Sequence, residues 1–512
     1  MAFKDDLVTA RSYIVFVLGL ITAFVMVYYI EQHSKLKTQI PPTAMVKSVI
    51  KLDQEKSLPD TMTPNTAVPT AVAATVIQQP KQAQTTVTHP TAANAKPNPL
   101  NAASQMMADV STKEPIILAS IELKTPTFGK RSKQKLTEQE LQWAKIAWQY
   151  FVNNTQKSTG LVNSVQGYPA TTLWDTASYM MAAIAAQRLS LIEQAEFDQR
   201  MSSVLNSLAI MPLVDNKLPN KSYNTISLAM TNYANKDSPK GIGWSAIDIG
   251  RLLVPLKILQ KKYPQHQAMV QKVLGRWSIP DVVHHNIMFG AAVDNNGNIK
   301  LMQEGRLGYE QYAAKTFALF NHQAKYAASY VNHLQYVDIY GIEVAVDKRD
   351  PKTSGAQNYV LSEPYILDGL EFGFDKNSKE LAARLFLVQQ ARYKNTGILT
   401  AVSEDHIDVA PYFVYNTVYV AGKTWAAITD KGQDASAFKS LSTKTVFGWH
   451  ALYNTDYSKK MLDAIKDLHD TNKGWYSGLY EQNQQPNKAI TANTNGVVLE
   501  SLAYIQLGKL LP

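Results

Sequence analysis

The chain has 512 residues, no cysteine and a formal net charge of +9, from 51 Lys and Arg against 42 Asp and Glu. It therefore has no disulfide framework, and its basic residues form no runs with interleaved aromatic residues, so we expect no nucleic-acid partner. The sequence also lacks the GxSxG, HExxH, Walker and GxGxxG patterns. No cofactor and no catalytic metal are expected on these grounds.

The aromatic residues divide the chain into two parts. No Phe, Tyr or Trp occurs between Tyr29 and Phe128, whereas the rest of the chain from Phe128 onward is rich in them. The first part cannot build a hydrophobic core, and the second is long enough to bury a deep one. We predict a cytoplasmic N-terminus at 1–12, a transmembrane anchor at 13–30, a flexible linker rich in Pro, Thr, Ala and Gln at 31–127, and one large domain at 128–512.

Residues 13–30 form an apolar segment without charge (YIVFVLGLITAFVMVYYI). At about 1.5 Å per helical residue this segment just spans a hydrocarbon core of about 30 Å. A cleaved signal peptide is the alternative, but no small-x-small cleavage site follows the segment. The lysines and arginines that flank the segment do not set its orientation in the membrane. We therefore infer the orientation from the long linker and the large domain that follow the segment. We predict a single-pass protein of the bacterial inner membrane with its C-terminal domain in the periplasm.

From Thr137 onward, helical signals dominate the sequence. Thr137 and Glu140 form a capping box, and apolar residues then recur with helical spacing. Residues 294–298 (DNNGN) predict a hairpin turn, so a few short strands are expected. Further helices are expected at 173–191, 193–211, 246–263, 264–277, 308–330, 378–393, 443–452, 457–469 and 495–507. Helices of this length joined by long loops favour a mainly α fold, a toroid of helical hairpins of the (α/α)6 type.

Carboxylates beside aromatic rings mark the candidate site. Residues 304–416 hold 11 of the 26 tyrosines and 14 acidic residues. Ring faces stack on the C–H surface of sugars, and two acids can divide the work of breaking a glycosidic bond. Glu310 lies at a helix start, where a carboxylate can equally well only satisfy the helix dipole. Glu363 precedes a proline, which predicts an extended backbone just before a helix.

Other residues of this region extend the candidate site. Asp368 and Glu371 follow Glu363 amid apolar residues, which would desolvate them and raise their pKa. The acidic cluster of Glu404, Asp405 and Asp408 predicts a cation site, a row of sugar-hydroxyl acceptors or a plain surface loop. The tyrosines that we assign to the wall of the cleft are Tyr309, Tyr365, Tyr412 and Tyr415.

Upstream and downstream loops repeat the pairing of acids with aromatic rings. Asp248 and Arg251 are spaced as an ion pair that would join two helices, which rivals direct contact with substrate. Asn493 is expected to cap the last helix and to do nothing else. The remaining substrate-binding candidates are Trp174, Asp175, Tyr223, Asn224, Trp244 and Trp475.

Several long motifs resemble a known family. WDTASYMMA (174–182), GWSAIDIGRLL (243–253), EGRLGYEQYAA (304–314), EPYILDGLEFG (363–373) and STKTVFGW (442–449) resemble the bacterial domain-of-unknown-function family 3131. That family is similar in turn to glucoamylase-like α/α-toroid enzymes acting on β-1,2-glucans, including glycoside hydrolase family 144. The resemblance implies a toroid and places Glu310 and Glu363 where those enzymes have essential glutamates, Glu310 as general acid and Glu363 as base or nucleophile.

The sequence therefore leads to three functional hypotheses. The first is a membrane-anchored glycosidase or transglycosylase acting on a β-glucan or exopolysaccharide through two carboxylates. The second is a polysaccharide-binding or export accessory protein of the cell envelope without catalysis. The third is a scaffold for envelope proteins, whose mouth would bind a peptide. The expected partners are a polysaccharide or oligosaccharide and, through the anchor, the membrane.

Overall fold

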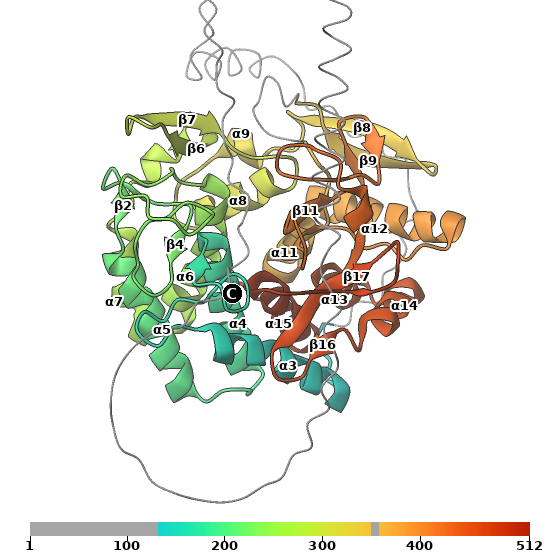
Figure 1. Ribbon diagram of the computed structural model, residues 1–512, viewed down its shortest axis with the longest axis horizontal. Helices are drawn as coiled ribbons and strands as arrows, with labels where there is room; N and C mark the ends of the chain where they lie inside the picture. The colour runs from blue at the N-terminus through green and yellow to red at the C-terminus, as the bar shows by residue number, and fades with distance from the viewer. Residues whose placement is uncertain (1–131, 350–357) are drawn as a thin grey trace, which may run out of the picture. The chain divides into compact units, whose positions relative to one another are not determined.

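The computed structural model describes residues 132–349 and 358–512. Within them, helices alternate along the chain between an inner and an outer position (Figure 1). The inner helices are α4 (Leu173–Arg188), α6 (Ala246–Lys262), α8 (Tyr309–Ala318), α11 (Glu363–Leu367), α13 (Thr443–Tyr453) and α15 (Ala492–Leu507). The outer helices are α3 (Glu138–Asn154), α5 (Gln194–Ile210), α7 (Gln267–Leu274), α9 (Lys325–Ala328), α12 (Lys376–Thr396) and α14 (Asp456–Ile465).

The inner helices form a closed ring. Each one contacts the next, from α4 through α6, α8, α11, α13 and α15, and α15 packs back against α4. Small residues permit the close crossings: a Cβ on Gly250 would lie 2.8 Å from the Cβ of Ala313, and one on Gly496 would lie 3.0 Å from the Cβ of Ser178. Because each helix packs on two neighbours within the ring, the chain closes a core rather than a layer.

The amino-acid pattern separates inner from outer helices. Helix α4 buries 13 of its 16 residues, and all 11 residues of α13 are buried. Helix α5, on the outside, buries only 7 of its 17 residues along one face. A helix that is apolar on all sides must be surrounded by protein, whereas an amphipathic helix lies at the surface. The outer helices cover the ring, with α3 against α4 and α15, α5 against α4, and α14 against α13.

Short antiparallel strands connect the helices. The hairpin β6–β7 (Ile287–Val293 and Ile299–Gln303) precedes α8, and β8–β9 (Leu334–Ile339 and Ile342–Asp347) precedes α11. Three strands, β10 (Glu404–His406), β11 (Phe413–Asn416) and β14 (Ala427–Ile428), form a sheet between α12 and α13. Strand β17 (Gly474–Tyr480) pairs with β15 (Ser440–Ser442), β16 (His469–Asp470) and β18 (Pro486–Ile490).

The remaining elements are short. They are β1 (Ala170–Thr171), β2 (Leu213–Val214), β3 (Leu218–Pro219), β4 (Tyr223–Asn224), β5 (Val283–His284), β12 (Tyr419–Val420), β13 (Lys423–Thr424), η1 (Pro264–His266), η2 (Ile279–Asp281), η3 (Asp368–Phe372) and η4 (Ser436–Phe438). Helix α11 continues directly into η3, a wider turn of the π type. The two together supply the inner helix at that position of the ring.

Most expected helices are confirmed, including the capping box at Thr137. The turn at 294–298 is confirmed as the connection of β6 to β7. Two local predictions are wrong. The helix expected at 308–330 ends at Ala318, and only the short α9 (Lys325–Ala328) follows within that range. Glu363 is the first residue of α11 and does not lie in an extended segment. Pro364 in the first helical turn has no hydrogen bond to lose, so it is compatible with a helix there.

The predicted N-terminus, anchor and linker (1–12, 13–30 and 31–127) lie outside the described residues. Within residues 132–349 and 358–512, no helix combines the length and the apolar character needed to cross a bilayer. The membrane anchor therefore stays a prediction. So does the domain boundary at residue 128.

Candidate functional site

The inner helices begin at the same end of the ring, and each brings a polar side chain to it. The side chains in the first turns are Asp175 on α4, Asp248 on α6, Glu310 on α8, Glu363 on α11, Lys444 on α13 and Asn493 on α15. We call this end of the ring the mouth. Alternating inner and outer helices run in opposite directions, so the inner helices all start on the same side. The partially positive amides at helix N-termini favour the carboxylates placed there.

Glu363 is the centre of the mouth. Its Oε2 forms a buried ion pair with the Nζ of Lys444 and accepts a hydrogen bond from Ser403 Oγ at 3.3 Å. Its Oε1 accepts a hydrogen bond from Asn493 Nδ2 at 2.8 Å. Burial works against the charge on Lys444, but the nearby carboxylates, first Glu363 and then Asp405, outweigh it and raise the pKa of the lysine. Glu363 and Lys444 are therefore held as a pair of ions.

Two further carboxyl groups share this cation. Asp405 lies 3.6 Å from Lys444 Nζ, is 2% exposed, and has neither oxygen in hydrogen-bonding geometry with a described residue. Burial raises the pKa of Asp405 to about 7, against the effect of Lys444. Burial and then the charge of Glu363 raise the pKa of half-buried Glu404. Three carboxyl groups around one ammonium cannot all be ionised at low cost, so the mouth retains a proton.

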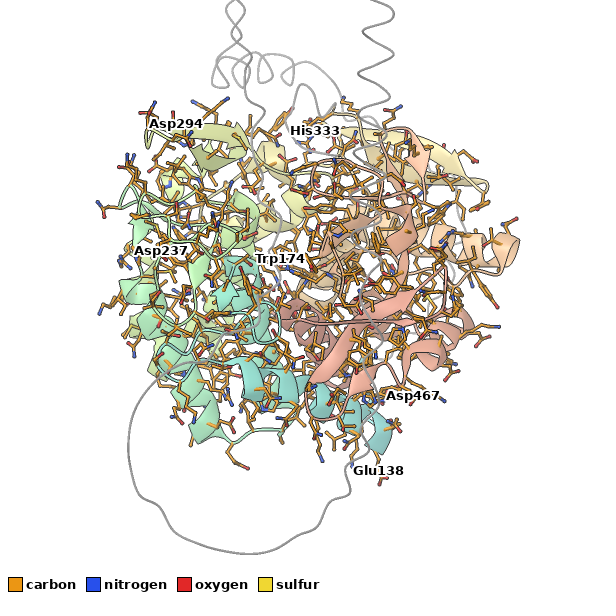
Figure 2. The ribbon with its side chains drawn as sticks, viewed as in Figure 1. Glu138, Trp174, Asp237, Asp294, His333 and Asp467 are labelled. Carbon is orange, nitrogen blue, oxygen red and sulfur yellow. The ribbon has the colours of Figure 1, made fainter. Side chains whose placement is uncertain are left out.

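Aromatic rings line the mouth beside these acids. The Tyr309 hydroxyl donates to Glu404 Oε1 at 2.6 Å, and its ring meets the edge of Trp174 at 5.6 Å between centroids. Trp174 is half-buried and lies near the centre of the view in Figure 2. Tyr415, opposite Glu404 in the β10–β11 register, stacks on Tyr359 at 4.2 Å. This wall of rings next to carboxylates confirms the pairing that the sequence predicts.

Two more predicted acids lie at the mouth. Asp175 accepts hydrogen bonds from Ser164 Oγ at 2.5 Å and Thr172 Oγ1 at 2.8 Å, and burial raises its pKa. Burial and then the charge of Glu304 raise the pKa of Asp248 to about 8. Asp248 accepts a hydrogen bond from Ser245 Oγ at 3.2 Å. The side of the mouth formed by α4 and α6 therefore adds weakly acidic groups to the cluster.

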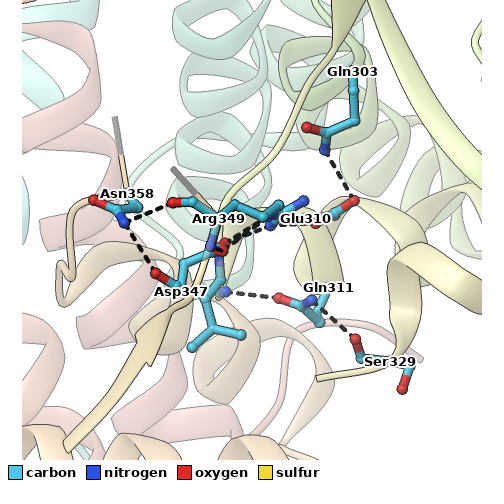
Figure 3. A network of polar contacts seen from close by, with 9 residues as sticks. Gln303, Glu310, Gln311, Ser329, Asp347, Arg349 and Asn358 are labelled. Atoms are coloured by element: carbon cyan, nitrogen blue, oxygen red, sulfur yellow. Dashed lines mark hydrogen bonds and ion pairs between the residues drawn. The ribbon is translucent and has the colours of Figure 1, made fainter. Parts of the chain in front are cut away.

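Glu310 belongs to a separate network of polar contacts (Figure 3). Its Oε2 pairs with Arg349 Nη2 at 2.7 Å, its Oε1 accepts from Gln303 Nε2 at 3.3 Å, and the side chain is fully buried. Burial raises its pKa, while Arg349 opposes that shift. Arg349 is also bound to Asp347 at the end of β9. The described contacts of Glu310 and Glu363 have no residue in common, so their pairing across one groove stays a prediction without support from the contacts.

The predicted pairing of Asp248 with Arg251 is wrong. Asp368 and Glu371 are buried and burial raises the pKa of each, as the sequence predicts, but both bind cations inside the ring, so their expected substrate contacts are corrected. Arg251 is fully buried and pairs with Glu371 and with Glu500, the latter at 2.5 Å. Asp368 is bound by Lys315 at 2.8 Å. Asp368 and Glu371 both lie in η3, and each binds a different cation. These residues join inner helices to one another inside the ring.

Some predicted subsite aromatics are core residues. Trp244 and Trp475 are at most 1% exposed, and their indole N–H groups donate to the backbone oxygens of Phe289 and Trp143, respectively, both at 3.2 Å. Tyr223 is fully buried, Tyr365 is 3% exposed, and the Asn224 side chain closes its own turn. The rings of the four aromatic residues are buried, and the Asn224 carbonyl accepts hydrogen bonds within its own turn, so the substrate contacts that we expected for Trp244, Trp475, Tyr223, Tyr365 and Asn224 are corrected.

The acidic cluster around Glu404 is a strand rather than a loop. Glu404 and Asp405 lie in β10, and Asp408 beyond it accepts from Tyr480 at 2.5 Å and from the backbone N–H of Lys488 at 3.0 Å. Tyr412 follows in the connecting loop, with φ 67°. Among residues 132–349 and 358–512, no group of three His, Cys, Asp or Glu residues is placed to hold a metal ion. The sugar-hydroxyl role of Glu404 and Asp405 stays a prediction.

Sequence reasoning missed three residues of the mouth. Lys444 was not singled out, Asn493 was expected only as a cap, and Arg306, whose guanidinium lies 4.0 Å over the Tyr359 ring, was not among the candidates. Lys444 and Asn493 share a signal, which is their position in the chain. Lys444 and Asn493 are each the second residue of an inner helix, as Glu310 is. Reading the first turn of every second helix would have found them.

The closed helical ring and its acidic, aromatic-lined mouth define an α/α-toroid domain. Residues 142–508 match the family described as "Protein of unknown function (DUF3131)". The chain belongs to the DUF3131 family, which confirms the resemblance noted from its motifs. None of the curated proteins matches the chain by sequence.

Solved structures share the fold. An endo-β-1,2-glucanase from Chitinophaga pinensis, in complex with sophorotriose and glucose, matches with a TM-score of 0.52 and 10% identity, over 73% of this chain and 94% of that one. A candidate glucoamylase from Bacteroides fragilis matches with a TM-score of 0.52 and 12% identity, over 73% and 93%. An endo-β-1,2-glucanase variant from Talaromyces funiculosus with bound β-1,2-glucan matches with 0.50 and 10%, over 73% and 84%. At these identities the likeness shows a common α/α-toroid fold.

Proposed function

We propose that this protein is a carbohydrate-active enzyme that hydrolyses or transglycosylates a β-glucan or related exopolysaccharide at the mouth. The observation that carries the proposal is the cluster of Glu363, Glu404 and Asp405 around Lys444. Glycosidic bond cleavage requires one carboxyl group that holds a proton at neutral pH and one that is ionised. The cluster supplies both. The glucan-bound toroids that share this fold support the choice of substrate class.

The geometry suggests a role for each acid. Glu404 is half-buried, its pKa is raised, and it lies beside the Trp174–Tyr309 rings, so it suits the general acid. Glu363, held as an ion by Lys444 and Asn493, suits the base or nucleophile. Asp405 holds a proton next to these two acids. The rings of Trp174 and Tyr309 can contact a sugar ring through their faces and edges.

The test is release of reducing sugar by the full-length protein in detergent from a panel of β-1,2-, β-1,3- and β-1,4-glucans. We expect activity on at least one glucan. Glu404→Gln and Glu363→Gln preserve the shape of each side chain and remove the acid, and each should lower the rate about 100-fold or more. Asp408→Asn is the matched control, since this acid lies beyond β10 and is bound to Tyr480; it should keep nearly full activity.

A specific observation favours a second candidate, a glycan-binding protein without catalysis. Both glutamates that the family resemblance placed in catalysis are neutralised by buried cations, Glu310 by Arg349 and Glu363 by Lys444. If the protein binds a glucan with no release of sugar, and Trp174→Ala weakens binding more than Glu404→Gln does, the binding role replaces the enzymatic one.

We also propose that the protein works in the bacterial periplasm, anchored in the inner membrane by residues 13–30. The support is the uncharged apolar segment followed by a long polar linker. Protease added to spheroplasts should degrade the C-terminal domain while the membrane is intact. Protection of the domain under these conditions would place it in the cytoplasm.

A further inference from the structure

Two aromatic rings meet away from the mouth, on separate hairpins. Tyr340 lies at the tip of the β8–β9 hairpin, and Trp425 directly follows β13. Their ring centroids are 6.3 Å apart and their planes are inclined by 26°, so the rings lie nearly parallel. Tyr340 is 43% exposed and Trp425 is half-buried. Neither ring belongs to the candidate site described above.

The backbone at both rings is unfavourable for an aromatic residue. Tyr340 has φ 59° and Trp425 has φ 55°, in the left-handed region that disfavours bulky side chains. Tyr340 and Gly341 form a two-residue turn with both φ angles positive, and Asn is the preferred residue at the first of these positions. A large ring that is exposed and held in a strained backbone points to a use other than folding.

A basic side chain also packs against this pair of rings. The guanidinium of Arg392, on outer helix α12, lies 5.0 Å over the Trp425 ring. Arg392 is itself fixed by two hydrogen bonds to Glu481, at 2.6 and 2.8 Å, and by one to Thr400. A cation on one ring face and a second ring beside it fix the orientation of Trp425. Because Glu481 neutralises Arg392, the pair presents ring surface rather than uncompensated charge.

This ring pair is joined to the mouth by backbone contacts. Trp425 N–H donates to the carbonyl oxygen of Val418 at 2.9 Å, and Val360 exchanges hydrogen bonds with Val418 and Tyr419. The residue before Val360 is Tyr359, which stacks on Tyr415 in the wall of the mouth. The segment that carries Trp425 is therefore hydrogen-bonded to the segment that carries Tyr359 of the wall.

We propose that Tyr340 and Trp425 form a second glycan-binding surface, which holds an uncharged polysaccharide strand outside the mouth by stacking on its sugar rings. The proposal rests on the proposed function for the class of ligand. The second surface strengthens the binding of long glycan chains and does not change the binding of short ones. A trisaccharide fills only the mouth, whereas a polymer reaches both sites and gains from the second contact by effective concentration.

The test compares linear β-1,2-glucan polymer with sophorotriose as probes for binding to the full-length protein. Tyr340→Asn is the informative variant, because Asn suits the positive φ of the turn and removes the ring. We expect Tyr340→Asn to unfold at or above the wild-type temperature, to bind the polymer about tenfold more weakly, and to bind sophorotriose as the wild type does. Trp425→Ala should weaken polymer binding in the same way, and Tyr340→Phe, which keeps a ring, should not.

The outcomes separate this proposal from the proposed function. Wild-type polymer affinity in Tyr340→Asn, or no polymer binding by the wild type, would overturn the second surface whatever the enzyme activity. Equal weakening for polymer and trisaccharide would also overturn it, because the rings would then act on the mouth. If polymer binding depends on Tyr340 while no sugar is released, the surface stands and the enzymatic role fails.

Discussion

The ring contains two groups of carboxylates around a buried cation, and they differ in what surrounds them. In the central network, Arg251 binds Glu371, Glu500 and the Tyr312 hydroxyl, and the side chains of Arg251, Glu371 and Glu500 are entirely inaccessible. Tyr312 also donates to Glu371 at 2.7 Å. In the mouth, the carboxyl groups around Lys444 include half-buried Glu404 and an Asp405 with no hydrogen-bond partner among described residues.

The comparison separates a structural role from a chemical one. The central network ties helices α6, α8 and α15 to η3, and its charged groups are bound to one another. The mouth instead places one carboxyl group with raised pKa, that of Glu404, in a half-buried position beside the rings of Trp174 and Tyr309. Buried charges alone do not mark an active site; a partly exposed carboxyl group with raised pKa beside aromatic rings is the better candidate.

The largest effect should come from the central network. Arg251→Met removes the cation and leaves two buried carboxylates without it, which typically costs about 3–5 kcal/mol of unfolding free energy. Urea unfolding of the full-length protein followed by circular dichroism measures the loss. Lys459→Met is the control, because its exposed pair with Asp456 should contribute less than about 1 kcal/mol. Equal stability of the two variants would contradict the structural role of Arg251.

The second effect concerns pH and sharpens the description of the mouth. The pKa of Asp405 is about 7 in the folded protein and about 4 when unfolded, so the fold binds this proton more tightly. The resulting stability is complete below pH about 4 and is lost as the pH rises through about 7. Asp405→Asn, which never ionises, should lack this loss, a difference of up to a few kcal/mol. Urea midpoints at pH 5 and pH 8 measure it.

A steeper pH dependence in Asp405→Asn than in the wild type would mean that Asp405 is ionised in the fold. Asp408→Asn is the control for this measurement as well. It removes a carboxylate of the same loop region that binds Tyr480 and lies away from Lys444. We expect its pH dependence to match that of the wild type.

The smallest effect distinguishes Glu310 from the mouth. Glu310→Gln loses the ion pair to Arg349, which keeps Asp347 as a partner, so unfolding free energy should fall by about 1–3 kcal/mol. Release of reducing sugar should change less than tenfold, whereas Glu404→Gln should nearly abolish it. A loss of activity in Glu310→Gln as large as in Glu404→Gln would restore the role that the family resemblance gives to Glu310.

The sequence predicted the helices well and the site in part. Helical periodicity and the capping box at Thr137 located α3 to α7 and α12 to α15, because local patterns determine such elements. The pairing of acids with tyrosines located the Glu404–Tyr309 side of the mouth. Periodicity gives no partner for a charge, however. Which cation binds Glu310, Glu363 or Glu371 depends on how the ring closes, since Lys444 lies 81 residues from Glu363 and Arg251 lies 120 residues from Glu371 along the chain.

Burial of single aromatic residues was equally beyond the sequence. Trp475 and Trp244 stand in loop-like, glycine-containing contexts that suit a binding surface, yet the fold places both in the core. Trp174 has a similar context and is only half-buried at the mouth. The difference arises because Trp174 lies in the first turn of an inner helix at the mouth, whereas Trp475 lies within β17 and Trp244 directly precedes the N-cap of α6, with its indole N–H bonded to Phe289.

Six polar side chains at this end of the ring each begin a different inner helix, and this has a consequence for how the protein can change. A substitution at Lys444, Asn493 or Asp175 alters one contributor while the other helices keep their own caps and neighbours. New specificities can therefore arise by single exchanges at the helix starts, without rebuilding the body of the ring. Relatives with the same scaffold and different residues at these six positions should differ in the sugars that they accept.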